Sequence, residues 1–332
     1  MSKRTRSDSE EVTSTKPFGT LSVFTYQGPL CTHFVPASQA EATLPALLSA
    51  IFGSRDRHSV FSFTAGEPGS TLVLDEALHR ELFGGSGSER WSCLYIHESS
   101  SARSGAEVSG SLSLLFDRLA GAHVPMLNVC TLRRNFVLVR KALADLALKT
   151  FRSALDNDGP SAAAGADSQP AAPPSRQLSE SGVRIELMSA SLAIGALTLA
   201  QLKQCAHGLL HLLFLRRGKQ FAHYFEIGGE VSLALSEVAL AALERAEPES
   251  AAALLAALKP SLSRGWRVLD VTMATGYDGI GILSAVCLPL ASLPLMNFST
   301  LDHTYVLVPD AHLDAALKLL APHFDVSREV AA

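Results

Sequence analysis

Apolar positions along the chain follow two alternating periods in a repeating order. Residues 21–26 and 59–64 show the short apolar runs of strands, whereas 39–52 has apolar residues every three or four positions, as in an amphipathic helix. The turn at 66–69 is Gly-Glu-Pro-Gly, which favours a hairpin, and Gly228-Gly229 favours a second one. Each half of the chain thus reads as two β-α-β-β-α units, which predicts an α+β fold of ferredoxin-like modules.

The second half of the chain repeats the first half. Segment 131–149 matches 300–318 without a gap, 169 residues later, across a predicted strand, loop and helix. Just upstream, 110–113 matches 281–284, now 171 residues apart, so the two-residue difference falls in a loop, where insertions are tolerated. A match that keeps strand, loop and helix in register indicates an internal duplication.

One polar stretch divides the two halves. Residues 156–177 are rich in Pro, Gly, Ala and Ser and have almost no large apolar side chain, so they cannot bury enough surface to offset the entropy of ordering. We therefore predict a disordered linker. The predicted organisation is a disordered tail at 1–18, modules at 19–88 and 89–155, the linker at 156–178, and modules at 179–262 and 263–330.

Composition narrows the class of protein. The chain has 332 residues, 47% of them hydrophobic and 18% charged, with a net charge of −4, which is not the footprint of a nucleic-acid or membrane-surface protein. No stretch reaches the roughly 18 to 20 apolar residues that a membrane span needs, and the polar N-terminus lacks a signal-peptide pattern. Five scattered cysteines in apolar segments indicate reduced, buried thiols. We expect a cytosolic protein with no nucleic-acid or membrane partner.

Several short segments are distinctive: FSFT (61–64), STLVLDE (70–76), HVPML (123–127), FVLVR (136–140), WRV (266–268), GYD (276–278) and LVP (307–309). Together they resemble the CASTOR family of arginine sensors, which are built from four ACT modules. The resemblance runs from about residue 21 to residue 320, with the polar interruption in the same central place, and the third module matches mainly in pattern.

The resemblance implies a non-enzymatic switch made of tandem ferredoxin-like ACT modules (βαββαβ). In that family, free arginine binds between the second and fourth modules and controls binding to the GATOR complex upstream of TOR kinase. The partners it implies here are a free amino acid and a GATOR-like protein complex. A homodimer is also possible. A second interpretation is a stand-alone ACT regulatory module for an amino-acid biosynthetic enzyme such as an aspartate kinase.

The residues at the implied site allow a physical interpretation. Gly279-Ile280-Gly281-Ile282 opens a predicted helix, where bare backbone N–H groups suit a ligand carboxylate. Segment 299–304 would face it with polar groups for an amino or guanidinium group. Alternatively, these glycines only allow close packing of helix on sheet. The predicted ligand-binding residues are Pro125, Met126, Gly276, Gly279, Ile280, Gly281, Ile282, Thr300, Leu301, Asp302 and Thr304.

Some of these residues depart from the family pattern. Thr304 stands at the position of the aspartate that binds the α-amine, and Pro125, which has no N–H, stands at that of a serine that helps hold the carboxylate. Asp302 could compensate, because residues two apart on a strand share a face. Arg133 and Arg134 place two positive charges at the matching turn of the first half. Arginine is allowed as the ligand, but these charges count against it.

The sequence gives only weak indications of a metal site or of catalysis. His207 and His211 have the spacing of a two-histidine metal site, but no acidic residue stands near them in the sequence, which favours packing histidines and no metal. The chain has no Gly-x-Ser-x-Gly motif, no plausible Cys/His pair and no paired carboxylates in a turn. We therefore predict that the protein is not an enzyme.

Overall fold

The computed structural model describes most of the chain. The described residues are 12–13, 21–26, 28–53, 60–66, 69–85, 89–98, 105–131, 134–157, 182–214, 221–272 and 280–329. Most of the predicted tail and linker therefore lies outside the described residues. Within the tail, β1 (Val12–Thr13) pairs with β2 (Leu21–Thr25).

Twelve strands form one closed antiparallel barrel. The last strand of the circuit pairs with the first, and each pairing around it is antiparallel. Outside the circuit, β2 also pairs with residues 94–98 of the barrel, and β15 (Val326–Arg328) pairs in parallel with residues 185–187. In order around the barrel, the strands are β6 (Arg90–Glu98), β3 (Leu30–Pro36), β5 (Gly69–Asp75), β4 (Phe61–Ala65), β10 (Ala222–Ile227), β11 (Glu230–Ser236), β9 (Arg184–Thr198), β12 (Ser263–Thr272), β14 (His303–Pro309), β13 (Met296–Ser299), β7 (Met126–Cys130) and β8 (Asn135–Arg140).

The prediction of tandem ferredoxin-like ACT modules is wrong. Four such modules would each have a sheet of their own, whereas all twelve strands here belong to one barrel. The difference arises at strand edges. A free edge leaves backbone N–H and C=O groups unpaired, and here β4 pairs with β10 and β7 pairs with β13, so these edges are joined across the halves. Closing a sheet into a barrel removes its edges.

The two halves contribute strands in the same order. The first half supplies β7, β8, β6, β3, β5 and β4 in succession, and the second supplies β13, β14, β12, β9, β11 and β10. At one junction Val129 pairs with Phe298, which stands 169 residues later, at the offset of the sequence repeat. At the other junction Phe63 pairs with Tyr224. Within its own hairpin, each of these two residues also pairs with the residue nine positions later, so the two occupy equivalent positions. Each junction therefore pairs a strand with its own counterpart.

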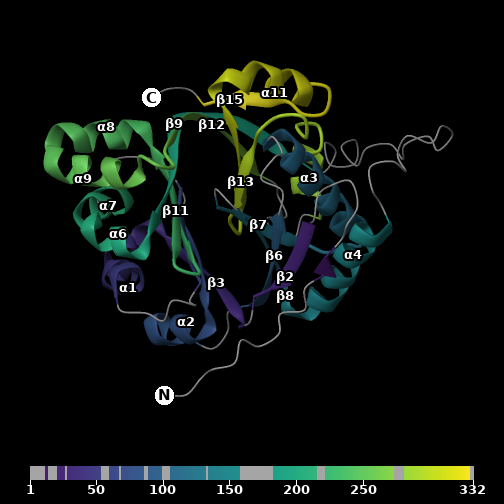
Figure 1. The fold of residues 1–332 in the computed structure, drawn as a ribbon, viewed down its shortest axis with the longest axis horizontal. Helices are drawn as coiled ribbons and strands as arrows, with labels where there is room; N and C mark the ends of the chain where they lie inside the picture. Colours follow the sequence, from purple (N-terminus) through teal and green to yellow (C-terminus); the bar gives the residue numbers. More distant parts are fainter. Residues whose placement is uncertain are drawn as a thin grey trace.

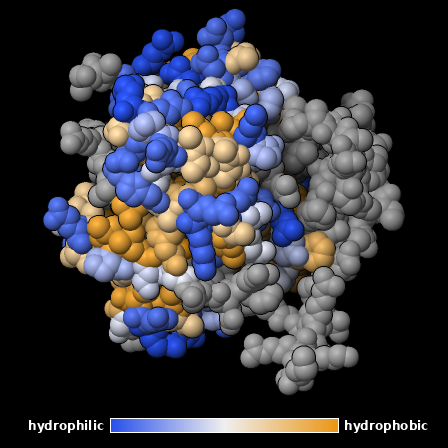
Figure 2. Space-filling view, turned by 60° about the vertical axis from the view of Figure 1, so that its left-hand side comes forward, coloured by the Kyte–Doolittle hydropathy of each residue, from blue (hydrophilic) through white to orange (hydrophobic). Residues whose placement is uncertain are grey.

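Helices cover the outside of the barrel on both of its sides (Figure 1). No helix among the described residues is both long enough and apolar enough to cross a membrane. Apolar and polar surface is mixed on the side where several of the helices lie (Figure 2). The helices are α1 (Ala40–Phe52), α2 (Glu76–Phe83), α3 (Gly105–Gly121), α4 (Ala144–Asn157), α6 (Leu199–Gln204), α7 (Ala206–Leu213), α8 (Glu237–Ala246), α9 (Pro248–Leu258), α10 (Ile282–Cys287) and α11 (Leu313–Leu320).

Apolar side chains form three cores. One lies between the barrel wall and α3, α4, α10 and α11, and a second lies beneath α1 and α6 to α9. The third fills the barrel itself. Strand β10 shows the alternation that produces this arrangement, because Ala222 and Tyr224 belong to the helix-covered core and Phe225 and Ile227 to the interior core.

The five cysteines are free and buried, as the sequence indicates. Burial raises the pKa of the Cys287 thiol to about 12 and that of Cys130 to about 11. Both thiols therefore remain protonated near neutral pH, which makes them poor nucleophiles and poor metal ligands.

Candidate functional site

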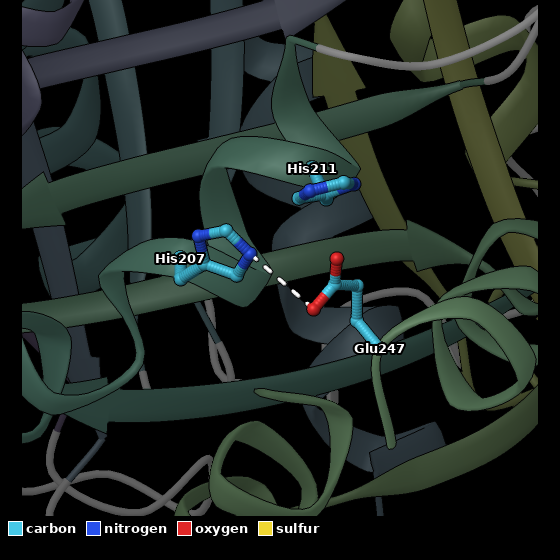
Figure 3. A group of neighbouring side chains, drawn as sticks. All are labelled: His207, His211 and Glu247. Atoms are coloured by element: carbon cyan, nitrogen blue, oxygen red, sulfur yellow. Dashed lines mark ion pairs between the residues drawn. The ribbon is translucent and has the colours of Figure 1, made fainter. Parts of the chain in front are cut away.

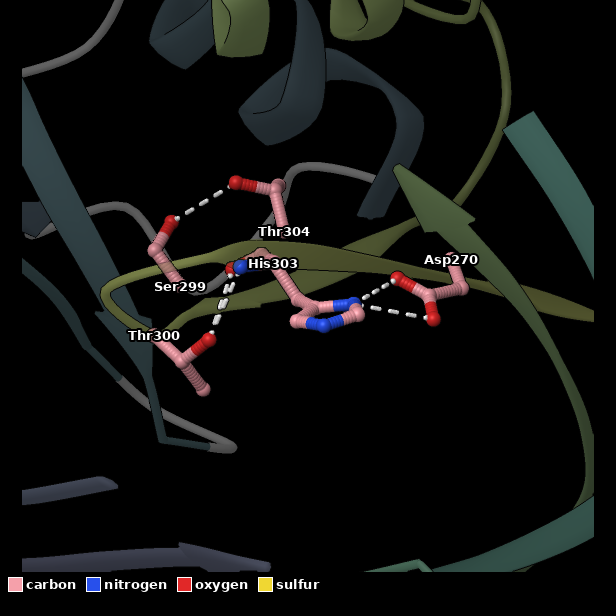
Figure 4. Close-up of polar contacts among 5 residues, drawn as sticks. All are labelled: Asp270, Ser299, Thr300, His303 and Thr304. Carbon is pink, nitrogen blue, oxygen red and sulfur yellow. Dashed lines mark hydrogen bonds and ion pairs between the residues drawn. The ribbon is translucent and has the colours of Figure 1, made fainter. Parts of the chain in front are cut away.

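The turn between β13 and β14 is held by hydrogen bonds between Thr300 and His303. Thr300 N donates to the carbonyl of His303 at 2.7 Å. His303 N donates to Thr300 Oγ1 at 2.9 Å (Figure 4). The matching turn in the first half has the same contacts, at 2.8 Å from Thr131 N to Arg134 O and at 2.9 Å from Arg134 N to Thr131 Oγ1. Because the hydroxyl of Thr300 is engaged in this turn, its observed role is to shape the hairpin.

The inner face of this hairpin carries an ionisable pair. His303 Nδ1 lies 2.8 and 3.0 Å from the two carboxylate oxygens of Asp270, on β12 (Figure 4). The ring of Tyr305 lies parallel to that of His303, with centroids 5.6 Å apart. Burial lowers the pKa of His303, but the hydrogen bond and charge of Asp270 outweigh it, so the pKa is raised overall. Burial, together with the charges of Asp270 and Asp302, also raises the pKa of Tyr305.

Strand register places two further charged residues beside this pair. On β9, Arg184 lies opposite Thr272 and Glu186 lies opposite Asp270. Thr272 in turn lies opposite His303 on β14. Residues directly opposite each other in a sheet share a face, so these side chains form a row along one rim of the barrel. Arg184 and Glu186 are exposed. The rim therefore presents a guanidinium and carboxylates side by side.

The predicted site residues near this turn divide between two faces of the barrel wall. Leu301 packs against the interior core, whereas Met126 packs against the core beneath α3 and α10. Thr304 faces Ser299, with 3.3 Å between their hydroxyl oxygens. Pro125 is buried. The β7–β13 pairing brings Met126 level with Leu301, so the structure does place these parts of the chain side by side, although not on one face.

Asp302 lies in the turn and not on a strand. It is exposed, and its charge contributes to raising the pKa of His303 and Tyr305 on the inner face. The rule that residues two apart on a strand share a face therefore does not apply between Asp302 and Thr304. Asp302 belongs instead with the charged rim.

Two of the three predicted glycines, Gly276 and Gly279, lie outside the described residues. Gly281 precedes α10 with φ 84°, a conformation that favours glycine, and its carbonyl accepts from Ala285 N at 2.8 Å. Ile280 is half-buried and Ile282 packs against the core beneath the helices. The backbone conformation thus gives a sufficient reason for Gly281 without a ligand.

A buried amide pair joins the two halves beside this site. Asn128 Nδ2 donates to Asn297 Oδ1, and the two residues occupy equivalent positions of the repeat, 169 apart. They are 0% and 2% exposed. Nearby, Ser113 Oγ donates to the carbonyl of Cys287 at 3.2 Å, which links α3 to α10. Sequence reasoning missed this pair, although an asparagine repeated within two apolar strands was a usable signal.

A separate cavity lies at the opposite end of β9. Its volume is about 310 Å³, and Gln201, Gly229, Glu230 and Ser261 are among the residues that line it. Thr198 and Gln201 at its edge bond each other as the capping box of α6. No predicted site residue lines it.

Comparisons with known proteins add little. No family model and no curated protein matches the chain. Among solved structures, aspartate kinase from Synechocystis is 11% identical over 94% of this chain and 57% of the kinase, with a TM-score of 0.30. A protein from Agrobacterium tumefaciens is 16% identical over 45% of this chain and 96% of its own, with a TM-score of 0.33. A Vibrio cholerae protein of unknown function, described as a possible transport protein, is 18% identical over 39% and 86%, with a TM-score of 0.28.

TM-scores this low support no conclusion on fold or function. The comparisons also give no support to a place upstream of TOR kinase or to a GATOR-like complex. These two expectations came from the resemblance alone and form no part of the proposal below.

Proposed function

We propose that this protein is a non-enzymatic regulatory protein that binds a free amino acid at the charged rim formed by β9, β12 and the β13–β14 turn. The resemblance to the CASTOR family implies a binding function of this kind and places it near the same hairpin. A protein partner that responds to the bound ligand, and a cytosolic location, remain predictions.

The observation that carries the proposal is the row of opposite charges on β9, β12 and the β13–β14 turn. The guanidinium of Arg184 suits a carboxylate, since its paired N–H groups match the two oxygens. The carboxylates of Glu186 and Asp302 suit an ammonium group. Asp270 is bonded to His303, which links β12 to β14. An α-amino acid carries both an ammonium and a carboxylate group, so one ligand could satisfy both sets of partners.

A thermal-shift screen of the full chain against the twenty free amino acids tests this proposal. A ligand at a hundred times its dissociation constant stabilises the folded state by about 2.7 kcal/mol, which shifts the melting temperature measurably. We expect one amino acid, or a chemically related few, to give such a shift. If none of the twenty does so, the proposal fails.

Variants locate the site once a ligand is found. Arg184→Gln and Asp302→Asn should each weaken binding at least tenfold by calorimetry, because each removes one charge-assisted contact. Arg245→Gln and Asp145→Asn are matched controls that change exposed residues on α8 and α4, and they should bind as the unaltered chain does. Equal affinity in all four variants would place the ligand elsewhere. The ligand should also be recovered unchanged after prolonged incubation.

A further inference from the structure

The fold brings an acidic residue to the histidine pair that the sequence left without one. His207 and His211 stand one turn apart on α7, and Glu247 lies at the junction of α8 and α9 (Figure 3). Their nearest ligand-type atoms all lie within 4.8 Å of one another. The side chain of His207 is 61% exposed, so it is not a packing residue of the core.

The distance between His207 and Glu247 suits a shared ion better than a direct contact. His207 Nε2 lies 3.6 Å from Glu247 Oε2, which is longer than the 2.7–3.2 Å of an ordinary N–H···O hydrogen bond. In a tetrahedral Zn²⁺ site with bonds of about 2.0–2.2 Å, two ligand atoms are separated by about 3.4 Å. The two imidazole rings are tilted by 55°, with centroids 4.9 Å apart, so they do not stack face to face.

Backbone packing determines where these groups meet. Gly208, next to His207, lies so close to α9 that a Cβ there would stand 3.1 Å from the carbonyl oxygen of Ser250. This close approach brings α7 to the start of α9. Glu247 is fixed between two helices, because its N–H donates to Leu243 O at 2.8 Å and its carbonyl accepts from Ala251 N at 2.9 Å. The carboxylate lies on the side of the junction that faces the histidines (Figure 3).

We propose that His207, His211 and Glu247 form a Zn²⁺ site with three protein ligands and a water molecule at the fourth position. Two imidazoles and one carboxylate are ligands that Zn²⁺ accepts, whereas Ca²⁺ and Mg²⁺ prefer oxygen alone. Exposure of His207 leaves room for the fourth ligand. The ion would link α7 to α8 and α9 and so stabilise the helical layer over the second core. This site is independent of the amino-acid site.

Metal titration of the full chain tests the site. Protein stripped with a chelator and then dialysed is titrated with Zn²⁺ in a calorimeter, and thermal unfolding is followed with and without the ion. We expect saturable binding of one equivalent and a higher melting temperature with Zn²⁺. Co²⁺ in place of Zn²⁺ should give the visible absorption of a four- or five-coordinate ion.

Single variants separate this site from adventitious binding. His207→Ala, His211→Ala and Glu247→Gln should each weaken Zn²⁺ binding at least tenfold and remove the thermal shift. His123→Asn is the matched control, since His123 is exposed and its positive φ of 54° is one that asparagine tolerates. Because His207 is largely exposed, its variant should melt as the metal-free unaltered chain does. No saturable binding, or equal affinity in all four variants, would overturn the proposal.

Discussion

A single buried histidine should make the protein sensitive to mild acid. His223 projects from β10 into the barrel and is fully buried. Its Nδ1 lies 2.8 Å from Thr64 Oγ1 in a hydrogen bond, its ring stacks on Phe298 at 4.0 Å, and its Nε2 has no hydrogen-bond partner among the described residues. A proton added there would place an unpaired charge in an apolar interior, so burial lowers the pKa of His223 to about 3.

The size of the effect follows from the two pKa values. In the unfolded chain a histidine has a pKa near 6.5, so below that pH the unfolded state binds a proton that the folded state does not. Stability is therefore highest above pH 6.5 and falls as the pH is lowered toward about 3. Each pH unit costs about 1.4 kcal/mol, so lowering the pH from 7.5 to 4.5 should remove about 3 kcal/mol through this residue alone.

Urea unfolding at several pH values measures this effect. His223→Gln keeps a polar group for Thr64 but cannot titrate, so its stability should fall less steeply below pH 6.5 than that of the unaltered chain. Other groups titrate equally in both proteins and cancel in the difference. If the His223→Gln variant loses stability as steeply as the unaltered chain, the reasoning is wrong.

Three more changes test the contacts around the site. Asn297→Leu should cost about 1–3 kcal/mol in urea unfolding, because the buried Asn128 amide would keep only Cys130 Sγ, a weak acceptor, as a partner for its Nδ2. Changing both asparagines to leucine should recover part of that loss, and strictly additive costs would contradict the pairing. Asp270→Asn should lower the pKa of His303 in an NMR titration. In the unaltered chain, the pair contributes stability below the ordinary histidine pKa and loses it as the pH rises through the raised pKa of His303. That pH-dependent contribution should disappear in the variant. Gly281→Ala should destabilise the ligand-free protein by about 1–2 kcal/mol, whereas no loss would show that its positive φ is not required.

Local structure was predictable from the sequence because it depends on neighbours in the chain. The hairpins at Gly66–Gly69 and Gly228–Gly229 and the helix beginning at residue 40 follow from turn chemistry and apolar periodicity. The barrel could not be predicted in this way. Backbone N–H and C=O groups form the pairings of β4 with β10 and of β7 with β13, and nearly every residue carries both groups. No residue type marks which edge a strand joins.

The local part of the candidate site was likewise predictable from the sequence, and the rest was not. The polar segment 299–304 was visible in the sequence, but Arg184, Glu186 and Asp270 join it only through the register of strands far apart in the chain. Similarly, Glu247 stands 36 residues after His211 and reaches it because α7 packs against α9. Constellations of this kind require the tertiary fold.

The pairing of each junction strand with its own counterpart has an evolutionary consequence. Such self-complementary edges are the contacts of a symmetric homodimer, so an ancestral half-length chain could have closed the same barrel from two identical copies. In that ancestor, a residue on the symmetry axis would have had to pack against the same residue of the second copy. Fusion into one gene removed that constraint, and the axis now pairs Val129 with Phe298 and Phe63 with Tyr224. Fusion also allowed one turn to carry Asp302 and His303 where its twin carries Arg133 and Arg134, so a single asymmetric site could evolve on a symmetric scaffold.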